Sequence, residues 1–261
     1  MVTGADALMT DNILPHRRAG SGVPMVLVHG YLGGSEQWAD EIAYFSKTFD
    51  VIAPDLPGYG EAATFPVLDR IGDMADAVIG LLDQLGVDRI ILLGHSMGGM
   101  IAQEIAARIG DRVKRLILYG TGPLGLMPDR FEPITLSQQR LKEDGVARTA
   151  QRIGATWFCD GTQARGFELV ASLGAQASDQ AALAGLVAMT HWDGRDALKT
   201  LKMPALVVWG DSDKSYRWPQ VESLWRTLPN AQLAVIPGTA HAAHLEKPHL
   251  FHVILEDFLT G

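Results

Sequence analysis

Short continuous apolar runs alternate with longer amphipathic segments along most of this chain. The apolar runs, which are typical of buried strands, occupy residues 24–28, 51–54, 90–93, 116–119, 205–209 and 233–236. A helix is expected from about Ser35, and residues 71–85 form another helix with one apolar face that ends at Gly86. A hairpin is expected around residues 10–12. This succession predicts an α/β fold with a mostly parallel sheet, helices on both faces, and a site at the carboxyl ends of the strands.

The pattern changes between Gly122 and about Lys202. This stretch has no strong strand, and helical spacing appears at residues 134–142, 146–158 and 167–173. A helical insertion is therefore expected there.

One serine stands between a buried strand and the start of a helix. Residues 90–99 read Ile-Ile-Leu-Leu-Gly-His-Ser-Met-Gly-Gly, so Ser96 lies at the centre of a G-x-S-x-G pattern. Glycines at positions 94 and 98 allow strand and helix to pass closely, and the strained turn then projects the hydroxyl outward. The turn has neither G-x-x-x-x-G-K-[ST] nor G-x-G-x-x-G. Because a purely structural glycine turn fits this pattern equally well, a catalytic interpretation depends on partners for Ser96.

An acid and a base follow in the chain, each directly after an apolar run. Asp211 and Asp213 follow residues 205–209, and we prefer Asp213 as the catalytic acid, with Asp211 bonded to the backbone of the turn. His241 and His244 follow residues 233–236, and His241 is preferred as the base because it is nearer the strand end. His244 is expected to pack or to line the pocket.

Together these segments resemble the α/β-hydrolase superfamily, over essentially the whole chain. Val26-Leu27-Val28-His29-Gly30-Tyr31 is similar to the family's early strand and oxyanion turn, residues 55–60 to its D-x-P-G-x-G loop, and residues 241–248 to its closing H-x-x-H-x-E-x-P segment. Ala240 departs from the glycine that relatives usually carry, which suggests a different loop backbone. Residues 214–219 are bulkier and more basic than usual.

The resemblance implies an eight-stranded sheet, with residues 1–122 and 201–261 as the core and residues 123–200 as a helical cap over Ser96. It also implies that the backbone N–H groups of Tyr31 and Met97 stabilise an oxyanion. Chemically, His241 would take the proton of Ser96 and return it to the leaving group, while Asp213 holds the imidazole tautomer.

Further side chains are candidates for contact with the substrate. Large apolar side chains more often pack in a core, and an arginine is more often solvated, although Arg217 at the rim would suit a substrate carboxylate. The candidates are His29, His95, Leu124, Met127, Trp157, Phe158, Met189, Trp192, Tyr216, Arg217, Trp218 and His244. Asp193 is expected to cap a helix.

Composition narrows the functional class. The 261 residues are 47% hydrophobic and carry a formal net charge of −8 without a cluster of Lys and Arg, which disfavours nucleic acid or an anionic membrane as partner. No signal peptide or apolar run of about 20 residues is recognised, so a cytoplasmic location is expected. The single cysteine, Cys159, is expected to fill a small gap, and neither a metal nor a cofactor is expected.

The expected function is hydrolysis of a small-molecule carbonyl compound, which we take to be an ester, an enol-lactone or a ring-cleavage product of aromatic catabolism. Two alternatives remain open at this point. One is a cofactor-free perhydrolase or oxygenase on the same scaffold, and the other is a small-ligand receptor without turnover. The sequence leaves a homo-oligomer open.

Overall fold

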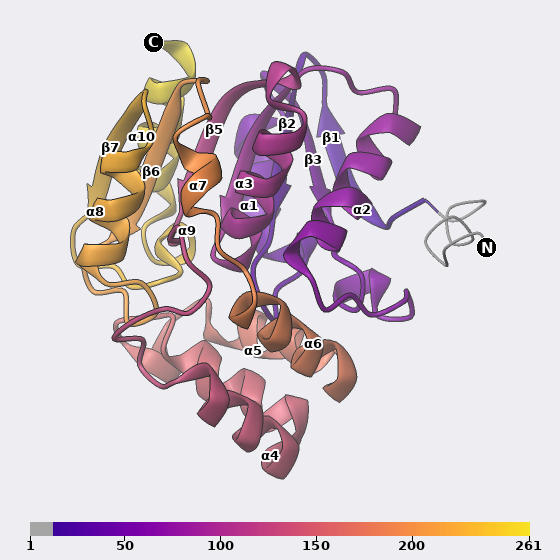
Figure 1. Ribbon diagram of the computed structural model, residues 1–261, viewed down its shortest axis with the longest axis vertical. Coiled ribbons are helices and arrows are strands. Elements are labelled where there is room, and N and C mark those ends of the chain that lie inside the picture. Colours follow the sequence, from indigo (N-terminus) through magenta and orange to yellow (C-terminus); the bar gives the residue numbers. More distant parts are fainter. Residues whose placement is uncertain (1–12) are drawn as a thin grey trace.

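The computed structural model describes residues 13–261, and a twisted seven-stranded sheet forms their centre (Figure 1). The sheet order is β1-β3-β2-β4-β5-β6-β7, and β1 runs antiparallel to β3 while all other neighbours are parallel. The strands are β1 (His16–Gly20), β2 (Val23–Val28), β3 (Phe49–Pro54), β4 (Ile90–His95), β5 (Val113–Tyr119), β6 (Ala205–Gly210) and β7 (Ala231–Ile236).

The expected mostly parallel sheet is confirmed, but residues 13–261 contribute seven strands instead of eight. The hairpin expected around Thr10, Asp11 and Asn12 lies outside the described residues.

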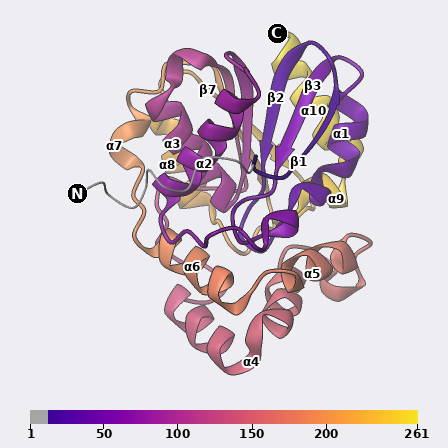
Figure 2. The same cartoon turned by 90° about the vertical axis from the view of Figure 1, so that its right-hand side faces the viewer.

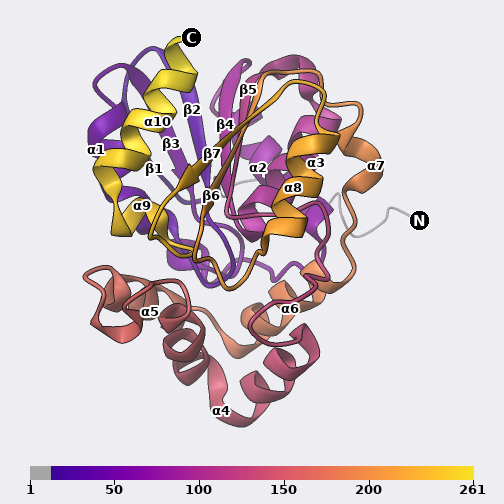
Figure 3. The same cartoon turned by 90° about the vertical axis from the view of Figure 1, so that its left-hand side faces the viewer.

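Alternation along each strand divides the core into two layers. In β2, Val26 and Val28 face one apolar cluster, whereas Met25 and Leu27 face the other. The first cluster is covered by α2 (Ile71–Gln84), α3 (Met97–Arg108) and α8 (Trp218–Thr227), and the second by α1 (Ala39–Phe45) and α10 (Pro248–Thr260) (Figure 3). The expected helix from Ser35 begins as a 3₁₀ turn, Ser35–Trp38, and continues as α1.

Three helices form a separate layer at one end of the sheet, beyond the loops (Figure 2). They are α4 (Ile134–Ala155), α5 (Phe167–Ala175) and α6 (Asp179–Thr190). Gly145 interrupts α4 with a φ of 76°, which explains why the sequence shows two helical patterns there. The short α7 (Arg195–Leu198) packs instead against α3 and α8 of the core, and the chain continues from it to β6 (Figure 1).

None of the helices in residues 13–261 combines the length and apolar character needed to cross a bilayer. The short α9 (Ala243–Glu246) precedes α10 and follows the loop after β7.

Candidate active site

Ser96 occupies a strained turn between β4 and α3. Its φ of 58° and ψ of −121° are unusual for a residue with a side chain, and such conformations cost about 1–3 kcal/mol, which the surrounding structure must supply. A Cβ on Gly94 would collide with the carbonyl of Gly98, and one on Gly98 with the carbonyl of Val28. The two glycines are therefore required where β2, β4 and α3 come together.

The loop after β2 closes on this turn. A Cβ on Gly30 would lie 2.8 Å from Ser96 Cβ and 3.0 Å from the carbonyl oxygen of His95, so only glycine fits. Within residues 13–261, the backbone N–H groups of Tyr31 and Met97 have no hydrogen-bond acceptor. Both therefore remain free to donate to a negatively charged oxygen beside Ser96.

His241 and Asp213 form a buried pair. The Nδ1 atom of His241 lies 2.8 Å from Oδ2 of Asp213, and both side chains are almost fully inaccessible to solvent. Oδ1 of Asp213 accepts the backbone N–H groups of Ser215 at 2.6 Å and Tyr216 at 3.1 Å, which fixes the carboxylate plane. The ring of Tyr216 stacks on His241, with 5.7 Å between centroids and 15° between planes.

Asp211 and His244, the alternative candidates for the acid and the base, have other hydrogen-bond partners. Asp211 is exposed and accepts the backbone N–H of Gly238, in the loop after β7, at 2.8 Å, whereas a bond to the backbone of its own turn was expected. His244 is fully buried, with Nδ1 3.0 Å from the hydroxyl of Tyr119. Burial lowers the pKa of His244 to about 3, so this ring is neutral at physiological pH.

The buried side chains of His95 and His29 form hydrogen bonds to the backbone of the loops around the site. His95 Nε2 lies 3.0 Å from the backbone oxygen of His241, and the two rings are 4.6 Å apart. His29 Nε2 accepts the backbone N–H of Leu56 at 3.0 Å, so its Nδ1 donates to the oxygen of Gly30 at 2.8 Å. Burial lowers the pKa of both histidines. Neither histidine lines the cavity described next.

Ser96 and His241 line one small cavity. The core contributes Tyr31, Ser96, Ser215, Tyr216 and His241, and the cap contributes Met127, Arg130, Ile153, Trp157 and Met189. Only about 20 Å³ is open to the centre of a water molecule, which is room for roughly one or two waters. Within the described residues, Nε2 of His241 has no hydrogen-bond partner, and the hydroxyl of Ser96 is not bonded to it. Such contacts are often long before substrate binds.

Comparison with known proteins assigns the family. Residues 23–248 match the model of the α/β hydrolase fold family. The chain belongs to this family. It is 28% identical to a 2-hydroxy-6-oxo-6-phenylhexa-2,4-dienoate hydrolase of Burkholderia cepacia, over 93% of this chain and 90% of that protein. It is 27% identical to 3-oxoadipate enol-lactonase 2 of Acinetobacter baylyi, over 89% and 87% of the two chains.

A solved structure agrees with this assignment. A thermophilic esterase from Thermogutta terrifontis, with malate bound, superimposes with a TM-score of 0.86 at 29% identity, covering 95% of this chain and 93% of that one. The relatives of this α/β hydrolase are thus named for hydrolytic reactions on different carbonyl compounds. The expected fold and the expected hydrolase family are confirmed.

The structure divides the predicted pocket residues of this α/β hydrolase into two groups. Met127, Trp157, Met189 and Tyr216 lie on the cavity wall with Ser96. Trp157 also connects the cap to the base, because its carbonyl accepts the N–H of Ala242 at 2.9 Å and its ring lies 5.3 Å from that of His241. His29, His95, Leu124, Phe158, Trp192, Arg217, Trp218 and His244 do not line this cavity.

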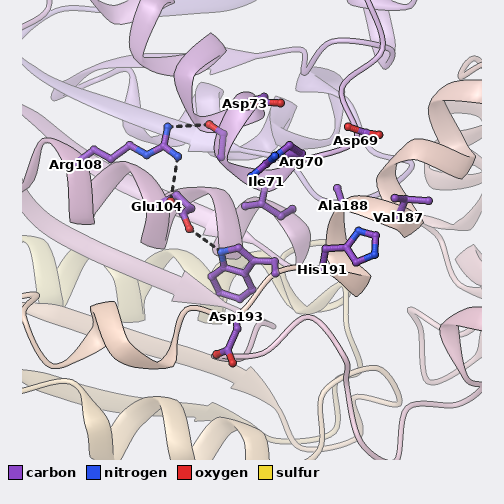
Figure 4. Close-up of a pocket in the computed structure, with 12 residues that line it drawn as sticks. Asp69, Arg70, Ile71, Asp73, Glu104, Arg108, Val187, Ala188, His191 and Asp193 are labelled. Atoms are coloured by element: carbon purple, nitrogen blue, oxygen red, sulfur yellow. Dashed lines mark hydrogen bonds and ion pairs between the residues drawn. The ribbon is translucent and has the colours of Figure 1, made fainter.

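Trp192 lies instead in a separate hollow between core and cap (Figure 4). Its indole N–H donates to Glu104 at 2.9 Å, and Glu104 in turn pairs with Arg108 at 3.2 Å. The hollow is larger, about 630 Å³, but it contains neither Ser96 nor His241. Asp193 follows, and its carboxylate accepts the backbone N–H of Arg195 at 3.1 Å and pairs with the guanidinium of the same residue. The N-cap of α7 is Gly194, whereas Asp193 was expected to cap a helix.

The remaining predicted residues have structural positions. Phe158 is fully buried in the apolar cluster on the cap side, and Leu124 forms an isolated bridge with Asp193. Trp218 is 38% exposed at the start of α8. Arg217 is exposed, and its guanidinium donates at 3.3 Å to the backbone oxygens of Asp129 and Asp213. It holds two loops together outside the cavity.

Four further side chains line the cavity but were not among the predicted substrate contacts, namely those of Tyr31, Arg130, Ile153 and Ser215. Arg130 lies in an irregular segment before α4, where no periodicity indicates which side chains point inward. Cys159 was expected to fill a buried gap, but it is exposed. Within residues 13–261, no group of three or more His, Cys, Asp or Glu side chains is placed to hold a metal ion.

Proposed function

We propose that this protein is a serine hydrolase that cleaves a small carbonyl substrate, such as an ester, a lactone or a ring-cleavage product, through an acyl-enzyme. The observation that supports this most directly is the buried pair of His241 and Asp213 beside the strained Ser96 in one closed cavity. The relatives named as an enol-lactonase, a ring-cleavage-product hydrolase and an esterase support the substrate range.

Each group has a defined task in the proposed reaction. Asp213 holds the proton of His241 on Nδ1, so Nε2 is unprotonated and able to accept the proton of Ser96 during attack. The free N–H groups of Tyr31 and Met97 would then donate to the oxyanion. His241 returns the proton to the leaving group, and a water molecule completes the cycle in the same way.

The small volume of the cavity sets a condition on this cycle. A space for one or two waters does not hold an ester or a lactone, so side chains of the cap such as Met127, Trp157 and Met189 must move when the substrate binds. Their return would exclude bulk water around the acyl-enzyme.

The test measures release of 4-nitrophenol from 4-nitrophenyl acetate by rapid mixing. We expect a burst equal to the enzyme concentration, an acetyl adduct on the Ser96 peptide by mass spectrometry, and a loss of about 10⁴-fold or more in Ser96→Ala. Ser212→Ala is the matched control, because Ser212 is exposed and bonded only to Asp211.

Two results would contradict the proposal. Turnover that needs dioxygen or hydrogen peroxide and forms no acetyl adduct would indicate the perhydrolase or oxygenase alternative. Ligand-dependent thermal stabilisation with no Ser96-dependent turnover of any ester or lactone would indicate a receptor.

A further inference from the structure

The wall of the Ser96 cavity carries one guanidinium and one tyrosine hydroxyl with free hydrogen-bond donors. We propose that Arg130, together with the hydroxyl of Tyr31, forms a subsite for a carboxylate group of the substrate. This inference rests on the proposed function, because it defines the substrate of the same site as a small hydrolysable compound with a free carboxylate.

Arg130 supplies the charge at the cavity wall. Its Nη1 atom donates to the carbonyl of Glu132 at 2.8 Å and to the hydroxyl of Ser137 at 2.9 Å, and the ring of Phe131 lies 4.1 Å from its Cζ. Within residues 13–261, its Nε and Nη2 atoms have no acceptor. Burial lowers the pKa of Arg130, but a guanidinium remains protonated at neutral pH. A fixed charged group with free donors therefore borders the cavity.

The local charge balance favours an anion. Arg140 and Arg152 bind the buried carboxylate of Glu132, at 2.7 Å and 2.6 Å, and Arg130 lies close to the same group. Three positive charges thus surround one negative charge. The Nε and Nη2 atoms of Arg152 are buried without a partner. The other carboxylate of the site, Asp213, is already bound to His241 and to backbone N–H groups.

The hydroxyl of Tyr31 completes the subsite. Tyr31 is 4% exposed and lines the cavity, and its hydroxyl has no hydrogen-bond partner in the described part of the chain. Burial raises the pKa of Tyr31, so its hydroxyl remains a neutral donor. A buried polar group normally has a partner, so this hydroxyl indicates an acceptor that the substrate brings.

The donor groups of the subsite determine which chemical class of ligand it can bind. Guanidinium and phenol groups all donate, so the complementary ligand is an acceptor with several lone pairs and a negative charge. A planar carboxylate is the smallest organic group of this kind and matches the fork of a guanidinium.

The experiment compares two esters that differ in charge. One is the 4-nitrophenyl monoester of adipic acid, which has a free carboxylate, and the other is the same compound with that carboxylate methylated. Initial rates of 4-nitrophenol release, corrected for spontaneous hydrolysis, give the ratio of kcat/KM for the charged over the neutral ester. We expect Arg130→Gln to lower this ratio by about ten- to a hundredfold, because a hydrogen-bonded charge pair is lost.

Matched variants separate binding from folding effects. Arg140→Gln also removes a positive charge from Glu132, but Arg140 is not on the cavity wall, so we expect the ratio to stay within about threefold. Tyr31→Phe removes one hydroxyl and keeps the ring, and we expect the ratio to fall by about threefold or more. It provides the test if Arg130→Gln does not fold.

A binding measurement separates this inference from the proposed function. In the Ser96→Ala background, adipate is expected to raise the Tm, its neutral diamide is not, and adding Arg130→Gln removes the shift. Failure of Ser96-dependent hydrolysis with this shift intact would refute the serine mechanism and leave the subsite standing. Ester ratios and melting shifts that do not respond to Arg130→Gln or Tyr31→Phe in folded protein would overturn the subsite.

Discussion

Replacement of Asp213 by asparagine tests the proposed mechanism without removing a contact from the loop. Oδ1 of Asp213 accepts two backbone N–H groups, so the oxygen of an asparagine must take that position. Its NH₂ group then faces Nδ1 of His241, where the carboxylate Oδ2 now lies at 2.8 Å. Because an NH₂ group donates, Nδ1 must become the acceptor, and the ring proton moves to Nε2. His241 is then unable to accept the proton of Ser96.

The expected decrease in kcat has two causes, the loss of the carboxylate charge and the change of the His241 tautomer. A carboxylate about 4 Å from the centre of an imidazolium contributes about 4 kcal/mol at an effective dielectric of 20, which is roughly a 10³-fold effect on rate. The wrong tautomer adds to this, so we expect kcat to fall by about 10³- to 10⁴-fold, similar to the same change in a serine protease triad.

The assay is 4-nitrophenyl acetate turnover at pH 7.5, with circular dichroism to show that the fold is retained. Asp211→Asn is the control, because this exposed acid does not contact His241, and the oxygen of an asparagine can still accept the N–H of Gly238. A change of less than about threefold is expected. A folded Asp213→Asn protein that keeps more than a tenth of the activity would refute the assigned role of Asp213.

Two further predictions concern the glycine turn and the buried histidines. Gly30→Ala places a methyl group 2.8 Å from Ser96 Cβ. Urea unfolding should therefore show a free energy of unfolding lower by about 1–3 kcal/mol, and kcat should fall at least about tenfold. Gly110→Ala is the control and should change neither quantity, because its Cβ would meet only Met203, at 3.5 Å. His244 has a pKa of about 3 in the folded protein against about 6.5 when unfolded, so the unfolded chain binds more protons below pH 6.5. The free energy of unfolding should therefore decrease from pH 7 to pH 5, and His244→Gln should remove about 2 kcal/mol of that decrease. An equally steep decrease in the variant would show that the pKa of His244 is the same in the folded and the unfolded chain, which would refute this prediction.

Hydrophobic patterning was sufficient to predict β2 to β7 and the glycine turn of Ser96. The central strand β4 is buried at every position, whereas the polar edge strand β1 gave no such signal. The interruption of α4 at Gly145 was visible as two helical patterns. His241 was preferred because it lies nearer the strand end than His244, and Asp213 because similar hydrolases use the last acid of G-x-x-D; the structure pairs these two residues. These features depend on local sequence. Where β2, β4 and α3 pack closely, residues other than glycine would collide at positions 94 and 98.

The cavity wall could not be predicted in the same way. Trp157 and Trp192 have the same chemistry in the same cap, yet one faces His241 and the other bonds to Glu104 in a different hollow. Arg217 was considered for a substrate carboxylate because it follows Asp213, whereas Arg130 is brought to Ser96 by the fold of an irregular segment. The side chains that enter the cavity are determined by how the cap packs on the core. The hydrophobic periodicity of the sequence does not predict this packing.

The bond between Trp157 and Ala242 has a consequence for timing. Ala242 is the neighbour of His241, and its N–H is held by a carbonyl of the cap at 2.9 Å. When the cap lifts to admit a molecule, the peptide next to the general base loses its anchor. In the proposed cycle, Asp213 and His95 would still hold His241 during this movement, but its loop would be most rigid with the bond from Trp157 in place. Proton transfer would thus be fastest after closure.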